Sequence, residues 1–280
     1  MAQTGRLTAP AVVAGGWAAL PERRRVALLR VAIIVTIVAV WEAVAASGLL
    51  FRDVVPSLVT VGRALVSILT VPDYKAQLFG SEYLIPEFYR HLWVTAYEVA
   101  TAMMIGGLAG LVVGLALGAN PFLSQAFERF LYYLGPTPKI IFFPLMIMWF
   151  GVGPGSKVAM GTISCFFPVV LSAAAGVRQI DKVLIRVGRS FRVNTWQMVT
   201  KIYLPAMRQP IINGVRLGLG VAVIGTLLAE TRLSNQGVGF LIINSYTTFD
   251  MPRMYALLIL LFGVSIAANT LVGRASRSGA

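Results

Sequence analysis

Few side chains in this sequence could do chemistry, and the two in the most unusual setting are Glu98 and Glu230. Each lies within or at the end of a long apolar segment. An ionisable group in such a segment is costly and is by default functional. We therefore expect both to face a polar solute path, with Arg216 as a candidate partner. A second interpretation stays open for Glu230, which could reach the membrane surface beside Arg232.

Other chemistries are excluded by composition. The chain has one histidine, His91, and one cysteine, Cys165, so neither an internal disulfide nor a multi-histidine metal site can form. No aspartate lies in an apolar segment, which excludes an aspartyl dyad. The sequence also lacks a Gly-x-x-x-x-Gly-Lys-Ser/Thr phosphate loop. We expect no catalytic residue, no metal site and no cofactor bound by this chain.

The composition defines an integral membrane protein. Of 280 residues, 57% are hydrophobic and only 12% are charged, and the mean hydropathy is +0.77. Soluble domains carry about 25% charged residues. The net charge of +13 comes from basic residues gathered between apolar runs, which is typical of membrane topology.

We predict an all-α membrane protein with six transmembrane helices, because six apolar runs approach the roughly 20 residues that span a bilayer. The third run is interrupted by Pro136, Pro138 and Pro144 and should be a broken helix. Glycines in the second run (Gly106, Gly107, Gly110, Gly114 and Gly118) favour close helix contacts. The expected spans are 26–47, 92–118, 130–152, 158–176, 211–229 and 254–272.

The Lys/Arg distribution predicts both termini in the cytoplasm. The chain then divides into a tail at 1–25, a transmembrane domain at 26–273 and a tail at 274–280. A cleaved signal peptide is a weaker reading of the N-terminal segment, whose apolar run is long for one. The outer loop at 48–91 should contain an amphipathic helix at 56–70.

The loop at 177–210 is long for a connection between spans and is predicted to fold as two short helices, 180–191 and 194–203. Asn194 is the expected N-cap of the second helix and Pro205 its stop. One face of the first helix is apolar and the other is basic. This pattern favours two interpretations equally: a helix pair resting on anionic lipid headgroups, or a plug that inserts into a groove of a cytoplasmic partner.

Several ordered motifs resemble the permeases of binding-protein-dependent ABC importers, in the nitrate, sulfonate, taurine and bicarbonate branch. The loop resembles their cytoplasmic EAA loop, and the resemblance covers nearly the whole chain. The motifs are Gly176-Val177-Arg178, Ile180-Asp181, Arg189-Ser190-Phe191, Ile202-Tyr203-Leu204-Pro205, Phe143-Pro144-Leu145, Trp149-Phe150-Gly151-Val152-Gly153, Ser156-Lys157, Ala229-Glu230 and Gly237-Val238-Gly239.

The resemblance implies a transport subunit of the bacterial inner membrane, not an enzyme. A second permease copy (in a homodimer or a heterodimer), two ATP-binding subunits that hold ATP and Mg, and a periplasmic or lipid-anchored solute-binding protein are its implied partners. It implies ATPase coupling by Arg186, Gly188, Arg189, Ser190, Phe191, Arg192, Val193, Asn194, Thr195, Trp196, Leu204 and Pro205. The candidate path residues are Glu98, Pro144, Met148, Trp149 and Glu230.

The implied cargo is a small anion such as a sulfonate, taurine or nitrate, with an aromatic carboxylate or a pyrimidine-type vitamin precursor as the alternative. The loop also departs from the family pattern. Where family members read Glu-x-Ala and, four positions on, Gly, this chain has Arg186, Gly188 and Arg192. A different class of protein remains in view, an ion-coupled secondary transporter that uses Glu98 and Glu230 as a proton relay, although no inverted repeat is detectable.

Overall fold

The computed structural model describes residues 21–48, 54–78 and 81–277, so most of the two expected tails lies outside the described residues. The chain divides into two units, residues 1–59 and residues 60–280, which are described separately. In the first unit, helix α1 (Glu22–Ser47) ends at Gly48, whose φ is +63°. Its last turns bind the chain that follows, because Trp41 Nε1 donates to Pro56 O and Leu58 N donates to the Glu42 carboxylate.

Helix α2 (Leu58–Thr70), the amphipathic helix expected at 56–70, starts in the last two residues of the first unit and lies mostly in the second. An antiparallel hairpin follows, in which β1 (Tyr74–Leu78) pairs with β2 (Ser81–Ile85). The sequence interpretation contained no strand here. This hairpin is the only sheet among the described residues, so the fold remains all-α in class.

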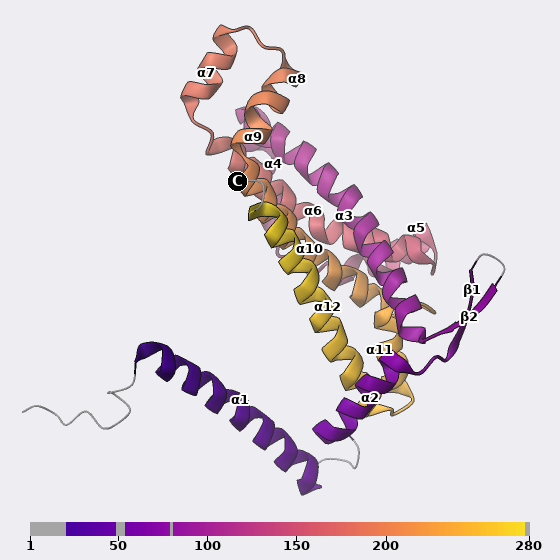
Figure 1. The fold of residues 1–280 in the computed structure, drawn as a ribbon. Helices are drawn as coiled ribbons and strands as arrows, with labels where there is room; N and C mark the ends of the chain where they lie inside the picture. The colour runs from indigo at the N-terminus through magenta and orange to yellow at the C-terminus, as the bar shows by residue number, and fades with distance from the viewer. Residues whose placement is uncertain (1–20, 49–53, 79–80, 278–280) are drawn as a thin grey trace, which may run out of the picture. The chain divides into compact units, whose positions relative to one another are not determined.

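The rest of the second unit is helical (Figure 1). Five helices of the described chain are long and apolar enough to cross a membrane, and a bent pair raises the number to six. The six-span prediction is therefore confirmed if the bent pair counts as one span. The helices are α3 (Glu87–Ala119), α4 (Pro121–Leu134), η1 (Lys139–Phe142), α5 (Phe143–Phe150), α6 (Pro154–Arg178), α7 (Lys182–Ser190), α8 (Thr195–Gln197), η2 (Met198–Tyr203), α9 (Leu204–Ala206), α10 (Arg208–Glu230), α11 (Val238–Thr247) and α12 (Met251–Arg277).

The bent pair is the proline-broken third span, but it begins at Pro121 and not near residue 130. Asn120 starts α4 by accepting from the amide of Phe122 at 2.9 Å, and Pro121 occupies the first turn, where its missing N–H costs nothing. The helices on either side of the break differ in direction by 94°. Lys139 donates to the Gly135 carbonyl at this break, which satisfies the exposed end of α4.

The core of the second unit is formed by α3, α6 and α10, which pack along their lengths (Figure 1). The α3–α6 contact is very close. A Cβ added at Gly106 would lie 2.5 Å from Cys165 Sγ, and one at Gly114 would lie 2.6 Å from Ala173 Cβ. The predicted role of the glycine stripe in helix contact is thus confirmed for these positions, because any side chain there would push the helices apart.

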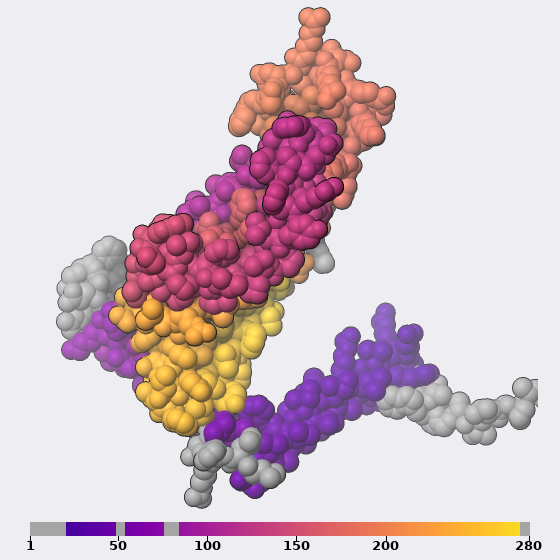
Figure 2. Space-filling model, turned by 180° about the vertical axis from the view of Figure 1, so that it is seen from behind, coloured from indigo at the N-terminus to yellow at the C-terminus, as the bar shows by residue number. Residues whose placement is uncertain are grey.

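The segment from α7 to α9 forms the two predicted short helices, the second of which is continuous from α8 through η2 to α9. It projects beyond the ends of the other helices of the second unit (Figure 2). We call this end the α7 end and the opposite one the α11 end. Pro205 is not the stop that the sequence suggested. It lies in the first turn of α9, and the helical backbone continues to Ala206.

Candidate functional site

Five polar side chains form a buried cluster at the α11 end, which we call the Glu98 cluster. His91, Thr95 and Glu98 come from α3, Lys157 comes from the first turn of α6, and Glu230 is the last residue of α10. The α3 members are spaced by four and three residues and so share one helix face. None is more than 6% exposed. So many buried polar groups require internal partners.

Glu230 caps helix α11. Its carboxylate accepts hydrogen bonds from Thr95 Oγ1 at 2.6 Å and from the Gly239 amide at 2.6 Å. The same Thr95 hydroxyl accepts from the amide of Val238 at 2.8 Å. A carboxylate at a helix N-terminus satisfies amides that have no partner within the helix and interacts favourably with the helix dipole. Glu230 therefore fixes the start of α11 on α3.

His91 holds the chain just before α11. Its Nδ1 accepts from the Gly237 amide at 2.9 Å, and its ring stacks on Phe240 at a centroid distance of 5.7 Å. Because Nδ1 accepts, the ring proton is on Nε2, which lies 3.3 Å from the Glu87 carboxylate and donates to it. His91 is thus a positioning side chain in a hydrogen-bonded chain, as its burial at 1% exposure requires.

Lys157 joins two turns at the α11 end. Its ammonium group donates to the carbonyls of Val152 and Gly153 in the turn before α6, and to the Leu233 carbonyl in the turn after α10 at 2.8 Å. Three donors therefore meet three carbonyl oxygens. Sequence reasoning missed this role because the predicted fourth span began at residue 158 and left Lys157 outside the membrane segment. Its helix in fact begins at Pro154.

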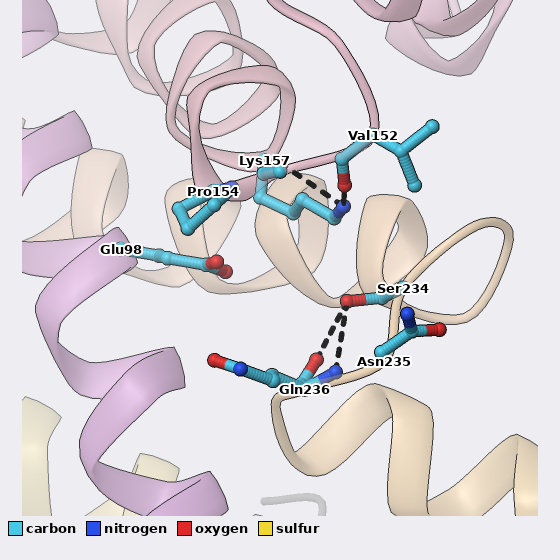
Figure 3. A pocket seen from close by; sticks show the side chains of 8 residues that line it. Glu98, Val152, Pro154, Lys157, Ser234, Asn235 and Gln236 are labelled. Atoms are coloured by element: carbon cyan, nitrogen blue, oxygen red, sulfur yellow. Dashed lines mark hydrogen bonds between the residues drawn. The ribbon is translucent and has the colours of Figure 1, made fainter.

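A pocket of about 350 Å³ adjoins the cluster (Figure 3). Glu98 reaches into it from α3, facing Lys157 and the turn at 234–236. The Glu98 Oε2 atom is buried and receives no hydrogen bond from any described residue. The pocket is lined by Glu98, Val152, Gly153, Pro154, Lys157, Ser234, Asn235 and Gln236.

The structure thus brings Glu98 and Glu230 together, but with Lys157 and not with Arg216. The Arg216 guanidinium instead donates to Asn269 Oδ1 at 2.8 Å. The interpretation of Glu230 as a side chain that reaches the surface beside Arg232 is wrong, because Glu230 is fully buried whereas Arg232 is exposed.

The other candidate path residues lie on α5 and do not line this pocket. Met148 is 82% exposed and Trp149 is 66% exposed, and Pro144 is also exposed. Their place in a solute path stays a prediction.

The candidate coupling residues lie in the projecting segment and are held by a defined turn. Helix α7 ends in a Schellman motif, in which the Val193 amide donates to Gly188 O at 3.2 Å and the Arg192 amide donates to Arg189 O at 3.0 Å. Arg192 occupies the left-handed position with φ +50°. Glycine is the residue that adopts this backbone most readily. Glycine would therefore be the least strained residue at this position.

The second helix of the segment begins with a capping box, as the N-cap prediction for Asn194 required. Asn194 Oδ1 accepts from the Gln197 amide at 2.8 Å, and Gln197 Oε1 accepts from the Asn194 amide at 3.1 Å. Gly188 is buried in the contact between the two helices, where an added Cβ would lie 2.5 Å from Ile202 Cδ1. The segment is a packed element and not an extended loop.

The tip of this segment exposes large apolar side chains beside arginines. Phe191 is 78% exposed and Trp196 is 74% exposed. Arg186, Arg189 and Arg192 are exposed as well. Of the remaining candidate coupling residues, Ser190, Asn194, Thr195 and Pro205 are exposed, and Val193 and Leu204 are half-buried.

The helices long and apolar enough to cross a membrane place the described chain in the class of multi-pass membrane proteins, and comparison with known proteins identifies the family. Residues 106–278 match the family described as "Binding-protein-dependent transport system inner membrane component". The chain belongs to this family. It is a permease subunit of an ABC importer and thus a transport subunit rather than an enzyme.

Curated relatives agree with this assignment, and solved structures show a similar fold. A Bacillus subtilis protein named for aliphatic sulfonates transport, the permease SsuC, is 29% identical over 224 residues, which are 80% of this chain and 76% of that protein. The taurine transport system permease protein TauC of Escherichia coli is 31% identical over 154 residues, 55% of this chain and 56% of TauC. The fold is similar to a chain of the inward-facing MetNI methionine ABC transporter, with a TM-score of 0.62 and 19% identity over 68% of this chain and 95% of that one.

Proposed function

We propose that this chain forms one half of the solute path of an ATP-driven importer, and that the α7–α9 segment couples the path to an ATPase subunit. The observation that carries the proposal is the projecting, doubly capped segment with Phe191 and Trp196 exposed at its tip. Exposed aromatic side chains beside arginines are typical of partner interfaces. A capped turn can transmit displacement because its geometry is fixed at both helix ends.

The connections of the segment explain how movement would reach the path. The segment continues from the end of α6 and leads into α10. These two helices carry Lys157 and Glu230 at their far ends. Force applied at the α7 end would therefore move the two turns that border the pocket at the α11 end. Arg178, at the end of α6, also pairs with Glu128 of α4 at 2.6 Å, which links the proline-broken span to the same helix.

The charge of the segment indicates the chemistry of the ATPase surface. Arg186, Arg189 and Arg192 are exposed on it, and complementary charge is expected on a partner that receives them. Arg186 takes the place of an acidic residue in related loops. Either an acidic residue on a dedicated ATPase or a second, different permease with the usual loop would accommodate this arginine.

The proposed cargo is a small organic or inorganic anion delivered by a soluble or lipid-anchored binding protein. The names of the relatives, aliphatic sulfonates for SsuC and taurine for TauC, support this class. ATP and Mg belong to the partner ATPase, and the chain itself holds no cofactor in this proposal. The proposed location is the bacterial inner membrane with both termini in the cytoplasm, so that the α7 end faces the ATPases.

The experiment is purification of the tagged chain from its native membrane in mild detergent, with mass spectrometry of the proteins that accompany it. We expect a phosphate-loop ATPase with the wild-type chain and its loss when Val193 and Trp196 are both changed to Asp. The matched control is Phe249→Asp, which alters an exposed aromatic residue at the α11 end (71% exposed) and should retain the ATPase.

A different outcome would overturn the proposal. Purification without any ATPase, together with solute uptake that survives ATP depletion and collapses with the proton gradient, would identify an ion-coupled carrier. In that case Glu98 and Glu230 would be the proton-carrying groups.

A further inference from the structure

In the pocket lined by Glu98, which we call the Glu98 pocket, one carboxylate oxygen has no hydrogen-bond donor among the described residues. Glu98 is 2% exposed, and its Oε2 has no partner among the described residues. A buried carboxylate oxygen without a hydrogen-bond donor is unfavourable. The atom therefore marks a place where the pocket is incomplete without something that donates.

The neighbouring groups do not meet this need. Lys157 lies near enough to attract Glu98 and Glu230, but its three N–H groups are directed to the carbonyls of Val152, Gly153 and Leu233. The Ser234 hydroxyl donates to Gln236 O at 2.7 Å. The Glu230 carboxyl of α10 is within hydrogen-bonding reach of the Glu98 carboxyl, and it too is an acceptor unless one of the two carries a proton.

The electrostatic character of the pocket follows from these contacts. Among the residues that line the pocket, the Glu98 carboxylate and the carbonyls of Val152 and Gly153 are acceptors, whereas the Lys157 ammonium already donates to carbonyl oxygens. The side chains of Asn235 and Gln236 offer both donors and acceptors. A solute with an ammonium or N–H group would supply the hydrogen-bond donor that Glu98 lacks. An anion without a donor, such as nitrate, would instead be repelled by the Glu98 carboxylate.

We propose that the Glu98 pocket is a solute-binding site that holds the ammonium or N–H end of the transported molecule through the Glu98 carboxylate. This inference rests on the proposed function and narrows it. Among small sulfonates and inorganic anions, this inference predicts that the transported solute also carries an amino group. Glu98 is then a specificity-determining residue, and Lys157 and Glu230 are positioning residues that hold the pocket walls.

The test measures the charge preference of the pocket directly. Asn235→Cys is introduced into the full-length chain in membrane vesicles with its partner subunits, in a Cys165→Ala background that removes the native thiol. Two thiol reagents of similar size are compared, the cationic aminoethyl and the anionic sulfonatoethyl methanethiosulfonate. Each reaction rate is normalised to the rate of the same reagent with a free thiol.

We expect the cationic reagent to react faster than the anionic one at the introduced cysteine, by about fivefold, because the Glu98 carboxylate faces the pocket whereas the Lys157 ammonium is surrounded by the carbonyls of Val152, Gly153 and Leu233. Glu98→Gln should reduce this preference to about twofold. Taurine should slow the reaction more than ethanesulfonate, which differs from it by the amino group alone. Thr248→Cys is the matched control, an exposed position at the same end that does not line the pocket.

Equal normalised rates with Glu98 in place would overturn the inference, and would indicate that a proton shared with Glu230 satisfies Glu98 instead of a solute. A preference that survives Glu98→Gln would also overturn it. The Glu98→Gln chain could fail to fold, which its elution profile would reveal. The inference is then tested by two measurements on the chain that retains Glu98: the ratio of the two reaction rates, and the slowing by taurine relative to ethanesulfonate. None of these reactions requires ATP hydrolysis, so failure here and failure of ATPase coupling are separate results.

Discussion

Gly237 lies so close to Glu230 that a Cβ at position 237 would be 2.2 Å from the Glu230 carboxyl carbon. The backbone of Gly237 also has φ +100°, which side-chain-bearing residues rarely adopt. The close approach allows the Glu230 carboxylate to accept from the Gly239 amide in the first turn of α11. The Ala229-Glu230 and Gly237-Val238-Gly239 motifs are therefore two halves of one contact.

The first prediction concerns this contact. Gly237→Ala should lower the free energy of unfolding by about 3 kcal/mol, because it combines overpacking with a strained backbone. The measurement is thermal unfolding of the purified chain in detergent. Gly220→Ala is the control, since no atom lies within 4 Å of its added Cβ; it should be neutral or slightly stabilising. Equal stability of both variants with wild type would contradict the close approach.

The second prediction concerns Lys157. Lys157→Met should lower the free energy of unfolding by about 3–5 kcal/mol, because it leaves three carbonyls without donors and Glu98 and Glu230 without a nearby cation. Exposed Lys182→Met is the control. Adding Glu98→Gln should restore part of the loss, by about 1 kcal/mol, since the two sites are electrostatically coupled. Strict additivity of the two changes in a double-mutant cycle would show that Glu98 and Lys157 do not interact.

The third prediction concerns Thr95, whose hydroxyl both donates to Glu230 and accepts from Val238. Thr95→Val keeps the shape of the side chain and should cost about 1–3 kcal/mol, because both buried partners lose a hydrogen bond. Thr101→Val is the matched control on the same helix, since Thr101 is half-buried and donates to the Tyr97 carbonyl of its own helix. Hydrogen exchange of the Val238 amide should accelerate in the first variant only.

The fourth prediction concerns the left-handed residue Arg192. Arg192→Gly should stabilise the α7–α8 turn by about 0.5–1 kcal/mol, because glycine adopts φ +50° without the strain of a Cβ. Arg192→Ala removes the same charge and should give no such gain. Hydrogen exchange of the amides from 191 to 197 distinguishes the two. A similar gain in both variants would attribute the effect to charge repulsion among the arginines.

The large elements of the fold could be predicted from the sequence because their signals are local. Apolar runs give the spans, and the pattern of basic and apolar residues with Asn194 gives the two short helices before α10. The start of α4 was harder to predict from the sequence, because the segment 121–134 is amphipathic and contains Glu128 and Arg129. Its acidic residue is satisfied by Arg178, a partner 50 residues away that no local pattern reveals.

The site could be predicted only in part for the same reason. Glu98 and Glu230 were recognisable as ionisable groups in apolar surroundings, but their partners come from other helices. Lys157 is separated from Leu233 by 76 positions, and Thr95 is separated from Glu230 by 135. The two carboxyl groups of this cluster could therefore be predicted from the sequence, whereas the side chains that donate hydrogen bonds within it could be identified only from the folded structure.

The tie between Lys157 and Leu233 also constrains the biosynthesis of the chain. A ribosome makes Lys157 before it makes Leu233. Helix α6 must therefore enter the membrane while one N–H group of Lys157 still lacks the Leu233 carbonyl to which it donates in the finished protein. A polar group left unsatisfied in hydrocarbon is unfavourable. Nascent chains that stop before residue 233 should accordingly be held at the insertion machinery or degraded, and release into the lipid should follow only once the α10–α11 turn has emerged.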